Sequence, residues 1–178
     1  MARRLGVIMD PIAGINPKKD TTLALLLAAQ NRGFELYYME MADLALIDGK
    51  AMAHMRELKV HNALDHWFDF VAAEPTAVTA LGELDCILMR KDPPFDMEFV
   101  FATYMLERAQ ADGALVVNDP CGVRDSSEKL FTAWFNDLCP PALLTRSKAD
   151  LREFYVQHHD IVVKPLDGMG GASVFRIR

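Results

Sequence analysis

The stretch LGVIMDPIAGINPKKDTTLALLLAAQNRGFELYYM, residues 5–39, decides the fold. It opens with the apolar run LGVIM (5–9), which has the length of a buried strand. Asp20 is a suitable N-cap for the periodic segment that follows, and Gly33 is typical of a helix C-terminus. A second apolar run, FELYYM (34–39), completes a strand–helix–strand unit. Such a unit predicts a parallel sheet.

The chain continues this alternation up to about residue 120. The elements expected next are a hairpin within 44–60 that turns at Asp48-Gly49, a partly helical segment within 62–82 around Trp67 and Phe68, a strand at 85–90, a helix at 97–113 and a strand at 114–118. These elements predict an α/β domain over residues 1–122, with a mostly parallel sheet and helices on both faces.

The pattern changes after residue 122. The elements expected there are a helix through Leu138 that begins at a capping box of Asp125 and Glu128, a short strand at 142–145, a helix from Ser147 to His158, and strands at 161–165 and 173–178. We therefore expect a smaller α+β region over 123–178.

Composition excludes several classes of protein. The 178 residues carry 19 Lys+Arg against 25 Asp+Glu, a formal net charge of −6, which argues against a nucleic-acid partner. The longest apolar run, Leu23 to Ala29, is far shorter than the ~20 residues of a membrane helix, so no membrane partner is expected. The odd number of cysteines, three, argues against a disulfide framework and favours the cytoplasm.

The most distinctive chemical motif is IVVKPLDGMGGASVF (161–175), a glycine-rich loop between two apolar runs. Glycines allow backbone N–H groups to approach an anion, and Lys164 could bridge phosphate oxygens. The loop matches neither a P-loop nor a dinucleotide-binding fingerprint. It is typical of a flap over a nucleotide, but a tight hairpin with a surface lysine explains these residues equally well.

Two charged loops follow predicted strands. MDPIAGINPKKD (9–20) and MRKDPPFD (89–96) lie where open α/β sheets bind ligands, although each could be a plain connecting loop. Lys129 is expected in the first turn of its helix, where a phosphate would offset the unfavourable helix dipole, or as a solvated surface lysine. The five histidines show no convincing metal-ligand spacing and are interpreted as surface residues: His54, His61, His66, His158 and His159.

Six blocks of sequence carry a resemblance to a known family. They are VIMDPIAGINPKKD (7–20), YYMEMADL (37–44), ILMRKDPPFDMEF (87–99), VVNDP (116–120), EKLFTAWF (128–135) and VVKPLDGMGGASVFR (162–176). Over essentially its whole length the chain resembles the bacterial glutathione synthetases of the ATP-grasp superfamily. Complete members are much longer, so we expect an N-terminal portion, either shortened or proteolysed, that is inactive alone.

The resemblance implies two sets of site residues. The ATP-binding set is Lys129, Lys164, Gly168, Met169, Gly170, Gly171, Ala172 and Ser173. The substrate-binding set is Asp10, Pro11, Ile12, Asn16, Arg90, Lys91, Asp92 and Asn118. No catalytic side chain is assigned, and the ligands of Mg²⁺ are expected beyond Arg178.

The resemblance also implies an activity. The carboxylate of γ-glutamyl-cysteine attacks the γ-phosphate of ATP, and the amine of glycine then displaces phosphate from the acyl phosphate. The expected partners are these substrates, Mg²⁺ with the ATP, and further copies of the chain in the complete enzyme. Two alternatives stay open: another ATP-grasp carboxylate–amine ligase, or a non-catalytic binding module of the same fold.

Overall fold

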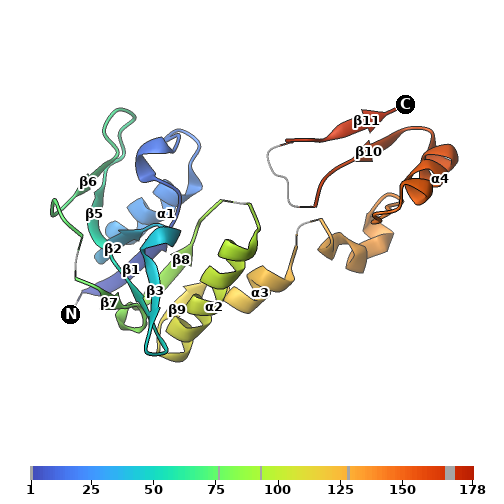
Figure 1. The fold of residues 1–178 in the computed structure, drawn as a ribbon. Helices are drawn as coiled ribbons and strands as arrows, with labels where there is room; N and C mark the ends of the chain where they lie inside the picture. The colour runs from blue at the N-terminus through green and yellow to red at the C-terminus, as the bar shows by residue number, and fades with distance from the viewer. Residues whose placement is uncertain (1, 76, 93, 128, 167–170) are drawn as a thin grey trace. The chain divides into compact units, whose positions relative to one another are not determined.

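The computed structural model of the chain describes residues 2–75, 77–92, 94–127, 129–166 and 171–178. The chain divides into two compact units (Figure 1). The first comprises Met1–Asp92 and Met97–Arg124, and the second comprises Pro93–Asp96 and Asp125–Arg178. No helix in the described part of the chain is both long and apolar enough to cross a lipid bilayer.

A six-stranded sheet forms the centre of the first unit, in the order β6-β5-β2-β1-β8-β9. The strands are β1 (Arg3–Ile8), β2 (Phe34–Met39), β5 (Arg56–Val60), β6 (Phe68–Phe70), β8 (Cys86–Met89) and β9 (Leu115–Val117). Strands β2, β1, β8 and β9 are parallel, whereas β5 and β6 are antiparallel at one edge. The prediction of a mostly parallel sheet is therefore confirmed.

Two hydrophobic clusters cover the two faces of this sheet. Side chains alternate between faces along a strand, so Leu5 and Val7 of β1 pack in the cluster that contains Leu26 of α1 (Thr21–Gln30). Ile8 packs in the other cluster, with Leu106 of α2 (Met97–Ala111). The second cluster also contains residues of a three-stranded antiparallel sheet, β3 (Leu44–Ile47), β4 (Lys50–Ala53) and β7 (Thr79–Ala80).

The order of the strands creates a crevice. The chain passes from β1 through α1 to β2 on one side, and from β8 through α2 to β9 on the other. The connections from the adjacent strands β1 and β8 thus lead in opposite directions. Ligands of open α/β sheets bind outside the carboxyl ends of strands at such a reversal.

Short helical turns and α3 (Pro120–Asp125) complete the first unit. The turns are η1 (Ile12–Gly14), η2 (Met41–Asp43) and η3 (Leu81–Glu83). The Asp48-Gly49 turn is confirmed: φ is 49° and 77° at these residues, and Ile47 pairs with Lys50 across it.

The helix expected around Trp67 and Phe68 is wrong. Phe68–Phe70 is strand β6, and Phe68 pairs with Val60 of β5. Phe68 and Phe70 alternate with Asp69, which turns both rings towards one face, where they pack against the core. The alternation of buried and exposed side chains, typical of a strand, therefore determines the secondary structure of this segment.

The second unit contains η4 (Phe131–Leu138), α4 (Lys148–His158) and an antiparallel pair, β10 (Ile161–Val163) and β11 (Phe175–Ile177). The Ser147 cap of α4 is confirmed, since its hydroxyl accepts a hydrogen bond from the Asp150 N–H at 3.2 Å. The predicted β-type runs on either side of the glycine loop also pair, with Val163 opposite Phe175.

Two predictions in this unit are wrong. No helix begins at Asp125; instead α3 ends there, and residues 131–138 form a 3₁₀ helix interrupted at Phe135, where φ is −129° and ψ is 47°. Its N-cap residue, Leu130, has no side chain that can cap the free N–H groups. Residues 142–145 form no strand, because no other described segment pairs with them.

Candidate functional site

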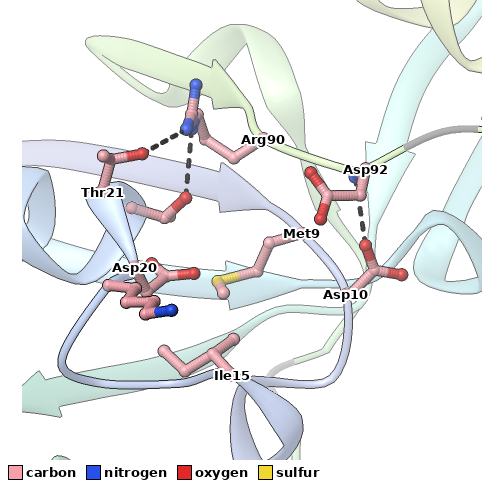
Figure 2. A pocket seen from close by; sticks show the side chains of 9 residues that line it. Met9, Asp10, Ile15, Asp20, Thr21, Arg90 and Asp92 are labelled. Carbon is pink, nitrogen blue, oxygen red and sulfur yellow. Dashed lines mark hydrogen bonds between the residues drawn. The ribbon is translucent and has the colours of Figure 1, made fainter. Parts of the chain in front are cut away.

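A pocket of about 210 Å³ lies at the carboxyl ends of β1 and β8, at the reversal described above (Figure 2). Three segments build it: the loop after β1, the first turn of α1 and the residues after β8. The lining residues are Met9, Asp10, Ile15, Lys19, Asp20, Thr21, Thr22, Arg90 and Asp92.

Arg90 is the best-positioned cation of the pocket. Its guanidinium donates hydrogen bonds to the hydroxyl oxygens of Thr21 at 2.8 Å and Thr22 at 3.1 Å (Figure 2). Its backbone N–H donates to the carbonyl of Ile8 at 2.7 Å, which extends the β8–β1 pairing. Both side-chain partners are neutral, and no carboxylate of the described residues forms an ion pair with Arg90. The geometry therefore orients a positive charge without neutralising it.

Asp10 joins the two loops of the pocket. Its carboxylate accepts a hydrogen bond from the backbone N–H of Asp92 at 3.0 Å and pairs with Lys91 Nζ at 2.9 Å. Lys91 also donates to the carbonyl of Asp92 at 2.6 Å. The neighbouring cations Arg90 and Lys91 thus have different roles, because Lys91 neutralises Asp10 and only Arg90 lines the pocket.

Charges of both signs line the remainder of the pocket. Asp20 caps α1 by accepting a hydrogen bond from the Leu23 N–H at 2.7 Å. Lys19 and Asp92 have no ion-pair partner among the residues that the structure describes. A ligand that carries both an ammonium and a carboxylate matches this arrangement better than a purely anionic one.

Comparison with known proteins identifies the family. Residues 4–124 match the sequence model of the prokaryotic glutathione synthetase N-terminal domain. Residues 128–178 match that of the prokaryotic glutathione synthetase ATP-grasp domain. The chain belongs to the prokaryotic glutathione synthetases.

Curated relatives agree with this assignment. Glutathione synthetase of Citrobacter rodentium is 59% identical over 175 residues, which cover 98% of this chain and 55% of that protein. The Escherichia coli K12 protein of the same name is 58% identical over 175 residues, or 98% of this chain and 54% of the relative. The chain therefore spans about half the length of the curated relatives that it matches.

Solved structures support the fold. The ATP-grasp ligase PsnB complexed with minimal precursor has a TM-score of 0.54 at 15% identity, covering all of this chain and 58% of PsnB. A PsnB complex that also contains Mg and ADP has a TM-score of 0.50 at 16% identity, covering 98% and 57%. D-alanyl-alanine synthetase A from Vibrio cholerae has a TM-score of 0.53 at 12% identity, covering 99% and 53%.

The pocket contains three residues of the predicted substrate-binding set, Asp10, Arg90 and Asp92. The other five are not among its lining residues: Pro11, Ile12, Asn16, Lys91 and Asn118. Ile12 is a buried core residue whose carbonyl accepts a hydrogen bond from Trp67 Nε1 at 3.0 Å. Contacts between the substrate and the eight residues of the predicted set stay predictions.

Sequence reasoning missed the two threonines that orient Arg90. The predicted helix N-terminus at Asp20 offered a signal, because the first turn of a helix that follows a strand lies at the same edge of the sheet. Nothing in the sequence indicated that an arginine almost 70 positions later would contact it.

The residues predicted to bind ATP lie in the second unit. Lys164 is exposed directly after β10. Lys129 is half-buried in a turn that precedes η4, so its predicted place in the first turn of a helix is wrong. Gly171, with φ of 79°, Ala172 and Ser173 are exposed before β11. Gly168, Met169 and Gly170 lie outside the described residues.

Proposed function

We propose that this chain provides the N-terminal domain and the start of the ATP-grasp domain of a glutathione synthetase. The reaction joins γ-glutamyl-cysteine to glycine, converts ATP to ADP and phosphate, and proceeds through an acyl phosphate. Family membership and 58–59% identity to curated glutathione synthetases support this proposal. The structural observation that carries it is the uncompensated guanidinium of Arg90 in a pocket at the sheet reversal.

The first unit is proposed to bind the dipeptide. The γ-glutamyl end of γ-glutamyl-cysteine carries an ammonium and a carboxylate. Arg90 and Lys19 provide positive partners for the carboxylate, and Asp92 provides a negative partner for the ammonium. Because Thr21 and Thr22 hold the guanidinium of Arg90, the site is organised before the ligand arrives.

The second unit is proposed to bind the phosphates of ATP through Lys129, Lys164 and the loop that ends at Ser173. An exposed lysine after β10 and a glycine at positive φ suit an anion. Bound Mg²⁺ would neutralise charge on the phosphates. Mg²⁺ prefers oxygen ligands, and we assign no described residue of this chain as a ligand of Mg²⁺.

A chimaera tests the proposal. Residues 1–178 replace the matching N-terminal segment of the E. coli relative, and ADP release is measured. We expect release that depends on both γ-glutamyl-cysteine and glycine. A folded chimaera that is inactive, alongside an active parent, would contradict the proposal, and activity only with another acid–amine pair would favour a different ATP-grasp ligase.

Substitution of Lys164 tests the ATP-binding assignment in the same chimaera. A charge-assisted contact to phosphate is worth ~1.5–3 kcal/mol, so Lys164→Ala should reduce kcat/KM for ATP about tenfold or more. Lys129→Ala should act in the same direction. Lys148→Ala, an exposed lysine of the same unit, is the matched control and should leave ATP kinetics unchanged.

Location and assembly are further parts of the proposal. We place the enzyme in the cytoplasm, consistent with Cys86, Cys121 and Cys139, which form no disulfide in the part of the chain that the structure describes. We also propose a homo-oligomer, supported by an exposed groove of about 530 Å³ along α2 that includes Phe101 and Tyr104. Analytical ultracentrifugation, with Phe101→Ser as the test variant, would show whether this face associates.

A further inference from the structure

The β5–β6 hairpin gathers two histidines and an aspartate that the proposed ligase reaction does not use. One carboxylate oxygen of Asp69, Oδ2, lies 2.8 Å from His61 Nε2 and 3.1 Å from His66 Nε2. The ligand atoms of the three residues all lie within 4.8 Å of one another. We propose that these three residues form a binding site for a divalent transition-metal ion such as Zn²⁺ or Ni²⁺.

The hairpin explains why residues without a recognisable ligand spacing meet. Asp69 pairs with Lys59 in the strand register, and the backbone N–H of His61 donates to the carbonyl of Trp67 at 2.8 Å. His61 and Asp69 are therefore diagonal neighbours on one face of the sheet, a separation that long side chains can bridge. The loop between the strands then returns His66 to the same place, where its ring stacks on that of His61 with centroids 5.5 Å apart.

The positions of the ligand atoms suit a metal ion. With bonds of ~2.0–2.1 Å to a tetrahedral Zn²⁺, neighbouring ligand atoms lie about 3.3 Å apart. The two nitrogen–oxygen distances, 2.8 and 3.1 Å, are shorter than that edge by about 0.5 and 0.2 Å. Small rotations of exposed side chains would admit the ion and leave a further position for water. Two imidazoles and one carboxylate favour Zn²⁺ and Ni²⁺ over Mg²⁺, which prefers oxygen.

The charges around the cluster favour a cation. Hydrogen bonds from His61 and His66 lower the pKa of the Asp69 carboxyl, so this ligand is ionised at neutral pH. Lys59, opposite Asp69 in the register, forms no ion pair with it among the described residues.

Isothermal titration of the chain, purified without a polyhistidine tag, tests the proposal with ZnCl₂ and NiCl₂. We expect one ion per chain. His61→Ala, His66→Ala and Asp69→Asn should each raise the Kd about tenfold or more, since each removes one of three ligands. The Asp69→Asn variant is the sharpest, because asparagine keeps the size and hydrogen-bonding capacity of aspartate but removes the negative charge.

Matched controls separate this site from other ligands of the chain. His54→Ala removes an exposed histidine of the same unit, and the double substitution His158→Ala/His159→Ala removes the adjacent pair of the second unit. Both should leave the Kd unchanged. Trp67 lies next to His66, so in a Trp134→Phe background bound Ni²⁺ should quench the remaining tryptophan fluorescence at one equivalent.

Three results would overturn the proposal. One is the absence of saturable Zn²⁺ or Ni²⁺ binding at millimolar concentration, which would leave the cluster as a hydrogen-bonded clasp of the hairpin. A second is wild-type affinity in the Asp69→Asn variant with metal-free circular dichroism unchanged. The third is loss of binding only in the His158/His159 variant.

Discussion

The two units of the chain differ in how far their apolar side chains are buried. The first unit buries them in two clusters, one on each face of a central sheet. In the described part of the second unit, Ile161, at 6% exposure, is the only buried hydrophobic residue, whereas Trp134 is 68% and Leu138 is 78% exposed. Burial of apolar area is the main favourable term in folding. The first unit should therefore be stable, and the second should open at a much lower free energy.

Two matched substitutions test this difference between the units. They are expected to give the largest change in the free energy of unfolding. Leu26→Ala removes a fully buried side chain of the first unit and should reduce the free energy of unfolding by about 2–5 kcal/mol. Leu138→Ala removes a side chain that is already mostly exposed and should cost less than about 0.5 kcal/mol. Urea denaturation measures both. Similar losses in the two variants would refute the contrast.

The second prediction concerns which unit recognises which substrate. Arg90→Ala in the chimaeric ligase should raise KM for γ-glutamyl-cysteine about tenfold or more, because a charge-assisted contact worth ~1.5–3 kcal/mol is lost. KM for ATP should stay nearly unchanged. Arg32→Ala, an exposed arginine at the far end of α1, is the control. A selective defect for ATP in the Arg90 variant would show that the dipeptide pocket is wrongly placed.

Close packing within the cluster that contains Ile8 gives the third prediction. A Cβ added at Gly6 of β1 would lie 2.6 Å from Leu84 Cδ1 and 2.8 Å from Met39 Cε. Leu84 and Met39 are buried, so the ends of their side chains have little space to move into, and Gly6→Ala should cost ~1–3 kcal/mol through overpacking. Gly14→Ala adds the same atom where no other atom lies within 4 Å, and its effect should be small. Thermal unfolding of the two variants measures the difference in their stability and so tests how tightly this face of the sheet is packed.

The smallest expected effect is a change in the stability of the second unit with pH. The Arg176 guanidinium holds the pKa of the Asp160 carboxyl below its ordinary value of 3.8. A depressed pKa contributes stability that is present above the unfolded value and is lost as the pH falls towards the folded one. Amide exchange in β10 and β11 should therefore increase slightly below about pH 4 relative to an Asp160→Asn variant. Near pH 7, the difference in amide exchange between the unsubstituted chain and the Asp160→Asn variant should not change with pH.

Local sequence patterns were reliable where one residue decides a conformation. The Asp48-Gly49 turn and the Ser147 cap are correct because a positive φ and an exposed helix N–H each have few chemical solutions. They failed at Trp67 and Phe68, where aromatic residues suit a helix or a strand, and pairing with β5 decided the outcome. They failed again at residues 142–145, where a run of strand length found no partner.

The sequence by itself determined the family, the strand–helix–strand core and the prediction that ligand-binding residues follow the strands. Only the tertiary structure decided which of those residues share a site. In the structure Arg90 contacts the threonines of α1, whereas the neighbouring Lys91 pairs with Asp10. The side chains of His61 and His66 lie beside that of Asp69. Local conformation depends on neighbours along the chain, which a sequence shows directly. A site depends on contacts between distant residues, which only the pairing and packing of strands create.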